Sequence, residues 1–154
     1  MSREYPDRPV VGVGVVVLAA GKVLLVRRGK PPREGQWSLP GGAQKLGETV
    51  FAAGAREVRE ETGLDVEVLG LLDVVDTIRN DESGRIRFHY TLVDVFAVVH
   101  AGALRAGGDA AEAAWFEVAD VPGLGLWSET ERMIALAVEM HQAIGAPASA
   151  GDEA

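Results

Sequence analysis

The order of apolar and polar positions divides the first part of the chain into two strands and a loop. Residues 10–19, VVGVGVVVLA, are largely β-branched and almost continuously apolar, and Gly21-Lys22 separates them from VLLVRR at 23–28. This pattern predicts a hairpin of two buried strands. The following GKPPREGQW, residues 29–37, combines prolines, glycines and charges and therefore predicts a loop.

A helical period follows over residues 49–62. In the sequence TVFAAGAREVREET, the side chains of Val50, Ala53 and Val58 can share one apolar face. Gly63 stands directly after this segment, where helices commonly end in a left-handed residue. The pattern predicts an amphipathic helix that stops at this glycine.

The remaining pattern predicts more strands and a second helix. Residues 65–78 and 85–99 are apolar runs on either side of the polar RNDESG, so they predict two strands joined by a turn. A loop at 101–110 leads to a short strand near AAWFEV, and the residues from Ser128 predict a final amphipathic helix. Several strands with one helix in the middle and one at the end predict an α/β fold, with helices on both faces of a mixed sheet.

Length and composition indicate one soluble domain. The chain has 154 residues, of which 47% are apolar and 25% are charged, which is enough for an ordinary single core. We expect residues 1–144 to form that domain and residues 145–154, which are small and polar, to form a flexible tail. The N-terminal MSREYPDRPVV has no signal pattern, and no apolar run reaches the roughly 20 residues of a membrane span. We therefore expect a cytoplasmic protein.

Cysteine content and net charge exclude several kinds of chemistry. The chain has no cysteine, which excludes thiolate catalysis and a cysteine zinc site. Its net charge of −8 argues against a nucleic-acid polymer as partner, because affinity for a phosphate backbone depends on clustered Lys and Arg. A single nucleotide stays open as a ligand if side chains or a bound divalent metal provide positive charge near its phosphates.

The predicted central helix carries three carboxylates close together. Glu57, Glu60 and Glu61 lie at positions i, i+3 and i+4, so their side chains project from one face within about 6 Å of each other. This spacing alone leaves two interpretations open. One is a solvated helix face that Arg56 and Arg59 partly neutralise. The other is a site for a hard metal such as Mg²⁺ or Mn²⁺, which prefers oxygen ligands and removes the repulsion.

The acidic helix belongs to a longer pattern. It runs from Gly42 through five residues to Glu48, then through seven residues to REVREETGL, which begins at Arg56. This pattern resembles the Nudix box, the signature of the Nudix hydrolase family. The wider resemblance takes in VGVGVVVL, KVLLVRR, the tryptophan before LPGG, and EAAWF. It implies the fold of that family, an α/β/α sandwich in which the box helix and the C-terminal helix pack on a mixed β-sheet.

The same resemblance implies roles for the residues of the box. The implied metal ligands are three acids and one backbone carbonyl: Glu57, Glu60, Glu61 and Gly42. The implied cofactor is Mg²⁺ or Mn²⁺, with two or more ions bound. Glu60 is the carboxylate expected to accept a proton from water, and an ion pair between Arg56 and Glu48 is expected to orient the other acids. The implied catalytic residues are Glu48, Arg56, Glu57 and Glu60.

Three residues outside the box are further candidates, each with a structural alternative. Glu112 resembles a position at which relatives provide one more metal-binding acid, but it is equally a surface glutamate at the start of a strand. Arg28 resembles a substrate contact, with a solubilising charge as the alternative. Tyr90 is a candidate to stack on a base, although its alternation with Phe88 and Leu92 favours core packing.

The resemblance implies an enzyme, a pyrophosphohydrolase that acts on small nucleotide substrates. The favoured reaction is the metal-dependent hydrolysis of a nucleoside diphosphate linked to another moiety, with ADP-ribose or a nucleotide sugar as the leading substrate. A (d)NTP pyrophosphohydrolase of the MutT type and a non-catalytic nucleotide-binding regulator stay open as alternatives. We expect no nucleic-acid polymer and no membrane as partner. Because relatives are often dimers, a homodimer through the apolar N-terminal strand is one expected arrangement.

Overall fold

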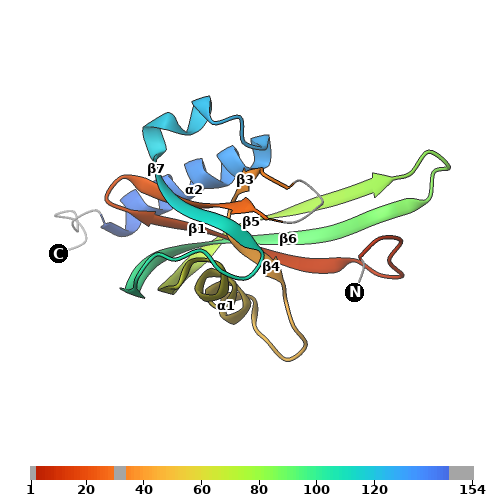
Figure 1. Ribbon diagram of the computed structural model, residues 1–154, viewed down its shortest axis with the longest axis horizontal. Helices are drawn as coiled ribbons and strands as arrows, with labels where there is room; N and C mark the ends of the chain where they lie inside the picture. Colours follow the sequence, from red (N-terminus) through yellow and green to blue (C-terminus); the bar gives the residue numbers. More distant parts are fainter. Residues whose placement is uncertain (1–2, 30–33, 146–154) are drawn as a thin grey trace, which may run out of the picture.

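A seven-stranded mixed sheet with one helix on each face organises the chain (Figure 1). The computed structural model describes residues 3–29 and 34–145. Its elements are β1 (Val10–Ala19), β2 (Lys22–Arg28), β3 (Trp37–Ser38), β4 (Gly41–Ala43), α1 (Val50–Thr62), β5 (Leu64–Asn80), β6 (Ile86–Gly102), β7 (Ala110–Glu117), the 3₁₀-helix η1 (Val118–Gly123) and α2 (Ser128–Gly145).

The sheet is built around β1. The strand order is β3-β2-β1-β6-β5, with β4 paired to β1 and β7 paired to β2. The pair β1–β6 is parallel, and the other pairs are antiparallel. β5 and β6 form a long hairpin that projects beyond the two helices (Figure 1).

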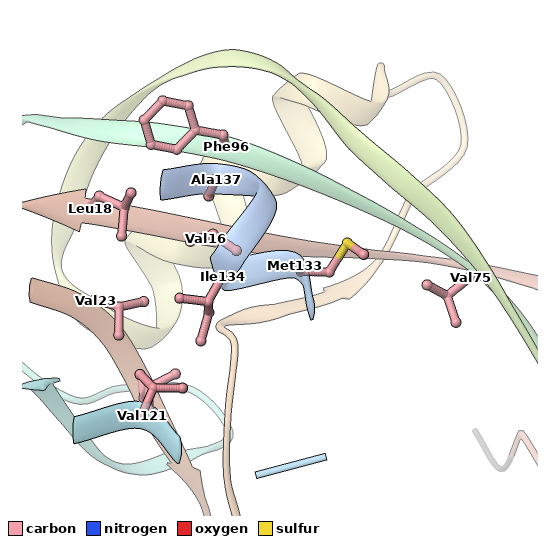
Figure 2. Packing of buried hydrophobic residues seen from close by; sticks show 10 residues of the cluster. Val16, Leu18, Val23, Val75, Phe96, Val121, Met133, Ile134 and Ala137 are labelled. Carbon is pink, nitrogen blue, oxygen red and sulfur yellow. The ribbon is translucent and has the colours of Figure 1, made fainter. Parts of the chain in front are cut away.

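Alternate side chains of β1 are buried on opposite faces of the sheet. Val16 packs in a core with Met133 and Ile134 of α2 (Figure 2). Val15 packs in a second core with Val58 of α1. A strand that is covered on both faces reads as a nearly continuous apolar run, which is the pattern of residues 10–19.

The two ends of α1 determine which way its side chains project. At the start, the Thr49 hydroxyl accepts a hydrogen bond from the Ala52 backbone N–H at 3.1 Å. At the end, Gly63 adopts a φ of 74°, and its N–H donates to the Arg59 carbonyl. A residue with a Cβ atom is strained in this left-handed conformation, so the glycine ends the helix at its predicted position.

This arrangement confirms the predicted α/β class, with a mixed sheet and a helix packed on each face. β1 is largely buried and has sheet partners on both edges, so little of this strand is free to form the expected dimer surface, and the homodimer itself stays a prediction. The predicted tail lies outside the described residues except for Gly145, the last residue of α2. In the parts of the chain that the structure describes, neither helix has the length and apolarity to cross a membrane.

One carboxyl group is buried within the sheet, on the side that α2 covers. Asp94 on β6 is 7% exposed and pairs with Gly14 on β1. A Cβ atom at position 14 would overlap the Asp94 Oδ1, so the glycine leaves room for this carboxyl group. Burial raises the pKa of Asp94 to about 6, although a hydrogen bond with the Gly14 backbone opposes the rise.

We expect Asp94→Asn to increase the free energy of unfolding near pH 7 by about 1–2 kcal/mol, because the folded state no longer holds a buried charge. In the parent, the pKa of Asp94 in the folded state is about 6, above the ordinary value of 3.8. Between these two pH values the folded state therefore binds more protons than the unfolded state. Its stability should therefore fall as the pH rises from about 4 to about 6. Urea unfolding across this range measures the effect.

The control is Asp120→Asn, which changes an exposed aspartate in η1. It should keep the pH dependence of the parent, whereas Asp94→Asn should lose the part of the fall that Asp94 causes. The raised pKa of Glu61 causes a further fall toward about pH 7 in both proteins. An Asp94→Asn protein whose stability changes with pH as the parent's does would contradict the assignment.

Candidate functional site

The second half of α1 places three carboxylates beside β4. Glu61 accepts a hydrogen bond from the Gly41 backbone N–H at 2.8 Å. The Glu57 carboxylate lies over Gly42, where a Cβ atom would come within 2.5 Å of its Oε1. The side chain of Glu60 is 48% exposed against 14% for Glu57. Solvent and ligands therefore reach Glu60 more easily.

Two consecutive glycines let the chain pass directly under these acids. At Gly41, an added Cβ atom would overlap the carbonyl oxygen of Val13 on β1. At Gly42, it would strike the Glu57 carboxylate. The turn is therefore pressed between the sheet and the helix, a close approach that only glycine allows without a shift of its neighbours.

Arg56 joins the loop before α1 to the acids of the helix. Its Nε and Nη2 donate hydrogen bonds to both carboxylate oxygens of Glu48, at 2.5 and 3.0 Å, and Nη2 also donates to the Ala43 carbonyl. Its Nη1 donates to Glu57 at 2.9 Å and to Glu60 at 3.2 Å. One guanidinium thus uses its planar fork of donors to hold three carboxylates.

The ion pair between Arg56 and Glu48 is mostly shielded from solvent. The two side chains are 19% and 16% exposed. Hydrogen bonds from the Arg56 guanidinium and the Lys45 backbone N–H lower the pKa of Glu48 to about 2. The Glu48 carboxylate in turn raises the pKa of Arg56. Both groups therefore stay charged at physiological pH, and the structure brings the two predicted partners together.

Glu61 is the most deeply placed acid of the cluster. It is 8% exposed, and this burial raises its pKa to about 7. The hydrogen bond from Gly41 opposes the rise, whereas the negative charges of Glu57 and Asp109 add to it. The positive charge of Arg28 lowers the pKa. A bound cation would favour the charged form of such a carboxyl group.

The residues of the cluster fit a hard divalent cation. The acidic side chains of the cluster present carboxylate oxygens, and Mg²⁺ and Mn²⁺ prefer oxygen ligands. Glu57 and Glu60 turn toward Arg56, whereas Glu61 turns toward Gly41. As a result, within residues 3–29 and 34–145, no three acidic or histidine side chains lie close enough together to hold a metal ion in this arrangement.

The loop between β6 and β7 packs against the end of α1 and completes the surroundings of the acids. The backbone N–H of Arg105 donates to the Thr62 carbonyl at 2.8 Å, and that of Gly107 donates to the Glu61 carbonyl at 3.1 Å. These bonds satisfy carbonyls that a helix end leaves without partners. They also bring Asp109 close enough to affect the pKa of Glu61.

The structure brings Arg28 to this site. Arg28 ends β2, and its charge acts on the buried Glu61. Gly29 follows Arg28, and its backbone N–H donates a hydrogen bond to the Asp109 carbonyl at 3.0 Å. This bond ties the end of β2 to the β6–β7 loop. A positive and a negative side chain, Arg28 and Asp109, therefore stand at the border of the acidic cluster.

The structure does not bring Glu112 to the cluster. Glu112 pairs with Arg27 across β2 and β7, and their side chains form an ion pair at 2.6 Å. Because side chains alternate along a strand, Arg27 and Glu112 share the face of the sheet opposite Leu24, whose side chain packs on the α1 side. Glu112 is therefore turned away from the box acids.

Tyr90 is also on the face opposite α1. It follows the same alternation as Leu92 and Phe96 of β6, which pack in the core beneath α2. Its ring stacks on Phe88, with ring centroids 6.5 Å apart. The side chain is half-buried among strand neighbours, in agreement with the packing alternative.

Sequence reasoning missed Asp109 because it lies in a loop outside the box. The available signal was the pair Gly107-Gly108 just before it, which marks a tight turn at the start of β7. A register shift between Arg27 and Arg28 then decides which side chains of β2 face the acids. Such a shift cannot be read from the order of residues.

The chain is similar to known proteins of one family over most of its length. The family model described as NUDIX domain matches residues 8–137. The chain is 38% identical over 116 residues to an ADP-ribose pyrophosphatase of Methanocaldococcus jannaschii, which is 75% of this chain and 66% of that protein. It is 45% identical over 67 residues to a putative 8-oxo-dGTP diphosphatase 2 of Mycobacterium tuberculosis, which is 43% of this chain and 47% of that protein.

The fold is similar to that of a solved MutT NUDIX hydrolase from Burkholderia pseudomallei. The TM-score is 0.71 at 30% identity, and the match covers 84% of this chain and 98% of that chain. The chain thus spans 66% and 47% of the lengths of the two curated relatives, but almost the whole length of the solved structure.

We expect Asp109→Asn to weaken Mn²⁺ binding by roughly tenfold, because it removes a negative charge beside Glu61. The matched change Glu112→Gln removes a negative charge on the opposite face and should leave the affinity within about twofold, since its exposed ion pair contributes little. Electron paramagnetic resonance of free Mn²⁺ measures both affinities. A loss of affinity in Glu112→Gln equal to that in Asp109→Asn would contradict the geometry.

Proposed function

Because the chain belongs to the Nudix hydrolase family, we propose that it hydrolyses a nucleoside diphosphate linked to another moiety, in a reaction that depends on a divalent metal. The observation that carries this proposal is the network in which Arg56 holds Glu48, Glu57 and Glu60 beside the buried Glu61. A solvated helix face needs neither the burial nor the close glycine turn.

The residues that would hold the metal are the three box acids and one carbonyl: Glu57, Glu60, Glu61 and Gly42. Their oxygen-only chemistry suits Mg²⁺ or Mn²⁺, and the summed negative charge suits two or more ions. When bound, such ions neutralise the charge of a diphosphate and increase the acidity of a coordinated water. The acidic chain has a net charge of −8, so it needs this positive charge to accept a diphosphate.

The chain's own residues position the reactants and move one proton. In the proposed reaction, the oxygen of a water molecule forms a bond to one phosphorus, and the bond from that phosphorus to the bridging oxygen breaks. Glu60 accepts the proton of the attacking water, a role for which its exposed side chain is accessible. Arg56 and Glu48 hold the acids in place without touching the substrate.

Two side chains at the border of the cluster complete the proposed site. Arg28 binds the phosphates of the substrate, because its guanidinium stands at the acidic cluster at the end of β2. Asp109 takes the place that sequence reasoning gave to Glu112, since Asp109 is an acid outside the box whose charge raises the pKa of Glu61. It contributes a further negative charge for the metal ions.

The favoured substrate is ADP-ribose or a nucleotide sugar. The support is the relative described as an ADP-ribose pyrophosphatase, which aligns with 75% of this chain. A (d)NTP pyrophosphohydrolase of the MutT type is the second candidate, and the relatives described as a MutT hydrolase and a putative 8-oxo-dGTP diphosphatase favour it. A non-catalytic regulator is disfavoured, because all four glutamates of the box and Arg56 are present.

We expect Glu60→Gln to reduce turnover by roughly 10²- to 10⁴-fold, because it removes the proton acceptor. Nucleotide release is measured with Mg²⁺, with Mn²⁺ and with chelator. The panel contains ADP-ribose, nucleotide sugars, and canonical and oxidised dNTPs. The parent should cleave one class only when metal is present, and ADP-ribose or a nucleotide sugar should be cleaved fastest.

The matched control is Glu139→Gln, an exposed glutamate on α2 on the other side of the sheet, which should keep full turnover. Retained affinity of Glu60→Gln for the substrate would show that chemistry, not binding, was lost. A parent that binds ADP-ribose and cleaves nothing in the panel would instead support a regulator.

A further inference from the structure

A hollow of about 480 Å³ lies between the start of β1 and the loop before α1. This volume is within the range of sites that bind small molecules. The lining comes from two segments, residues 8–11 and residues 44–48. The Gln44 backbone N–H donates a hydrogen bond to the Val11 carbonyl at 3.0 Å, which joins the two segments. Of the residues assigned to the hydrolysis, Glu48 alone belongs to this lining.

The hollow begins next to the box acids. Glu48 in its lining and Glu57 of the box accept hydrogen bonds from different sides of the Arg56 guanidinium. With hydrogen bonds of ordinary length on both sides, the two carboxylates are about 7 Å apart. Gln44 in the lining lies two positions after Gly42, which is also about 7 Å along an extended chain. A group attached to a diphosphate at the acids therefore reaches the hollow.

The lining of the hollow has more positive than negative charge, although the chain as a whole has a net charge of −8. Its cations are Arg8 and Lys45, and its acid among the described residues is Glu48. The Arg56 guanidinium already binds both oxygens of the Glu48 carboxylate. Arg8 has an ion pair with Asp7, but both side chains are exposed, so this pair contributes little. The hollow therefore favours a ligand with an anionic group.

Aliphatic side chains contribute to the same lining. Val11 lies on the α1 face of β1, because it alternates with Val13, which packs in the core under α1. Leu46 in the loop is fully exposed. A ligand that covers these side chains removes apolar surface from water. Apolar side chains beside two cations suit a sugar ring, whose C–H groups pack on the aliphatic surface and whose acidic group meets the cations.

We propose that the hollow binds the moiety attached to the nucleoside diphosphate, and that Lys45 and Arg8 favour a sugar that carries a carboxylate. This inference rests on the proposed function for the position of the diphosphate. The lining has one positive charge more than it has negative charges, so one carboxylate matches it. A phosphate group carries up to two charges and would leave an excess beside Glu48. The expected substrate class is a nucleotide sugar whose sugar is a uronic acid.

The test compares the affinities of ADP-glucuronate and ADP-glucose, which differ in a single group of the sugar. Isothermal titration calorimetry on the Glu60→Gln protein with Mg²⁺ measures binding without turnover. ADP-glucuronate should bind roughly tenfold more tightly, because its carboxylate forms charge-assisted contacts. In the same protein, Lys45→Gln should reduce this preference to about twofold or less, and Lys45→Glu should reverse it by like-charge repulsion. Lys45 is exposed in a loop, so both variants should keep the fold.

Lys22→Gln is the matched control, because it removes an exposed lysine at the other end of β1. Lys22 pairs with Ala19, the last of the 10 residues of β1, which places it roughly 30 Å from the hollow. This variant should keep the preference for ADP-glucuronate. The proposal is overturned if ADP-glucuronate binds no more tightly than ADP-glucose, if Lys45→Gln keeps the full preference, or if Lys22→Gln loses as much of it.

A second pair of variants tests the location of the sugar. Leu46→Glu adds a negative charge to the lining and should weaken the binding of ADP-glucuronate several-fold more than that of ADP-glucose. Ile144→Glu adds the same charge on α2, where Ile144 is 56% exposed, and should change neither affinity. A Leu46→Glu protein with the preference of its parent would place the sugar elsewhere and overturn the proposal.

Turnover of ADP-ribose by the parent tests the proposed hydrolysis separately. A parent that cleaves ADP-ribose, while its Glu60→Gln variant binds the two sugar compounds equally, keeps the proposed function and overturns this inference. A parent that cleaves nothing, while the Lys45 variants change the preference as expected, supports the assignment of the hollow and contradicts the hydrolysis.

Discussion

The repulsion among carboxylates on one face of α1 is the constraint on which the site depends. Two unit charges about 5.5 Å apart repel by roughly 1 kcal/mol in water and 3 kcal/mol at an effective dielectric constant of 20. Glu57 forms two pairs at this helical spacing, with Glu60 and with Glu61, and Glu61 is buried. The Arg56 guanidinium offsets part of this repulsion and ties the acids to Glu48. The remaining negative charge is what a divalent cation would neutralise.

The alternation of side chains along the strands decides which other residues join these acids. Arg28 ends β2 next to the cluster, whereas its neighbour Arg27 points to the opposite face and binds Glu112 there. Tyr90 is likewise held on the α2 side by its strand register. The β6–β7 loop contributes Asp109 instead, because its backbone caps the end of α1. One face of the sheet therefore carries the proposed chemistry, and the other is filled by the core under α2.

The sequence predicted the parts that depend on local pattern. The periodicity of residues 49–62 and the glycine at 63 predicted α1, and the resemblance to the Nudix box implied that Arg56 would meet Glu48. It did not predict β3 and β4, because strands of two and three residues have no periodicity to read. Nor did it predict Asp109, since a register shift in β2 and the path of a loop are set by tertiary packing.

We propose that the planar fork of Arg56 holds the acids in an arrangement that binds a metal. The Mn²⁺ affinity of Arg56→Lys, measured by isothermal titration calorimetry, tests this role, because the change keeps the positive charge but removes the planar set of donors. We expect an affinity roughly 10- to 100-fold weaker than that of the parent. An unchanged or tighter affinity would show instead that the arginine competes with the metal for the carboxylates and does not support its binding.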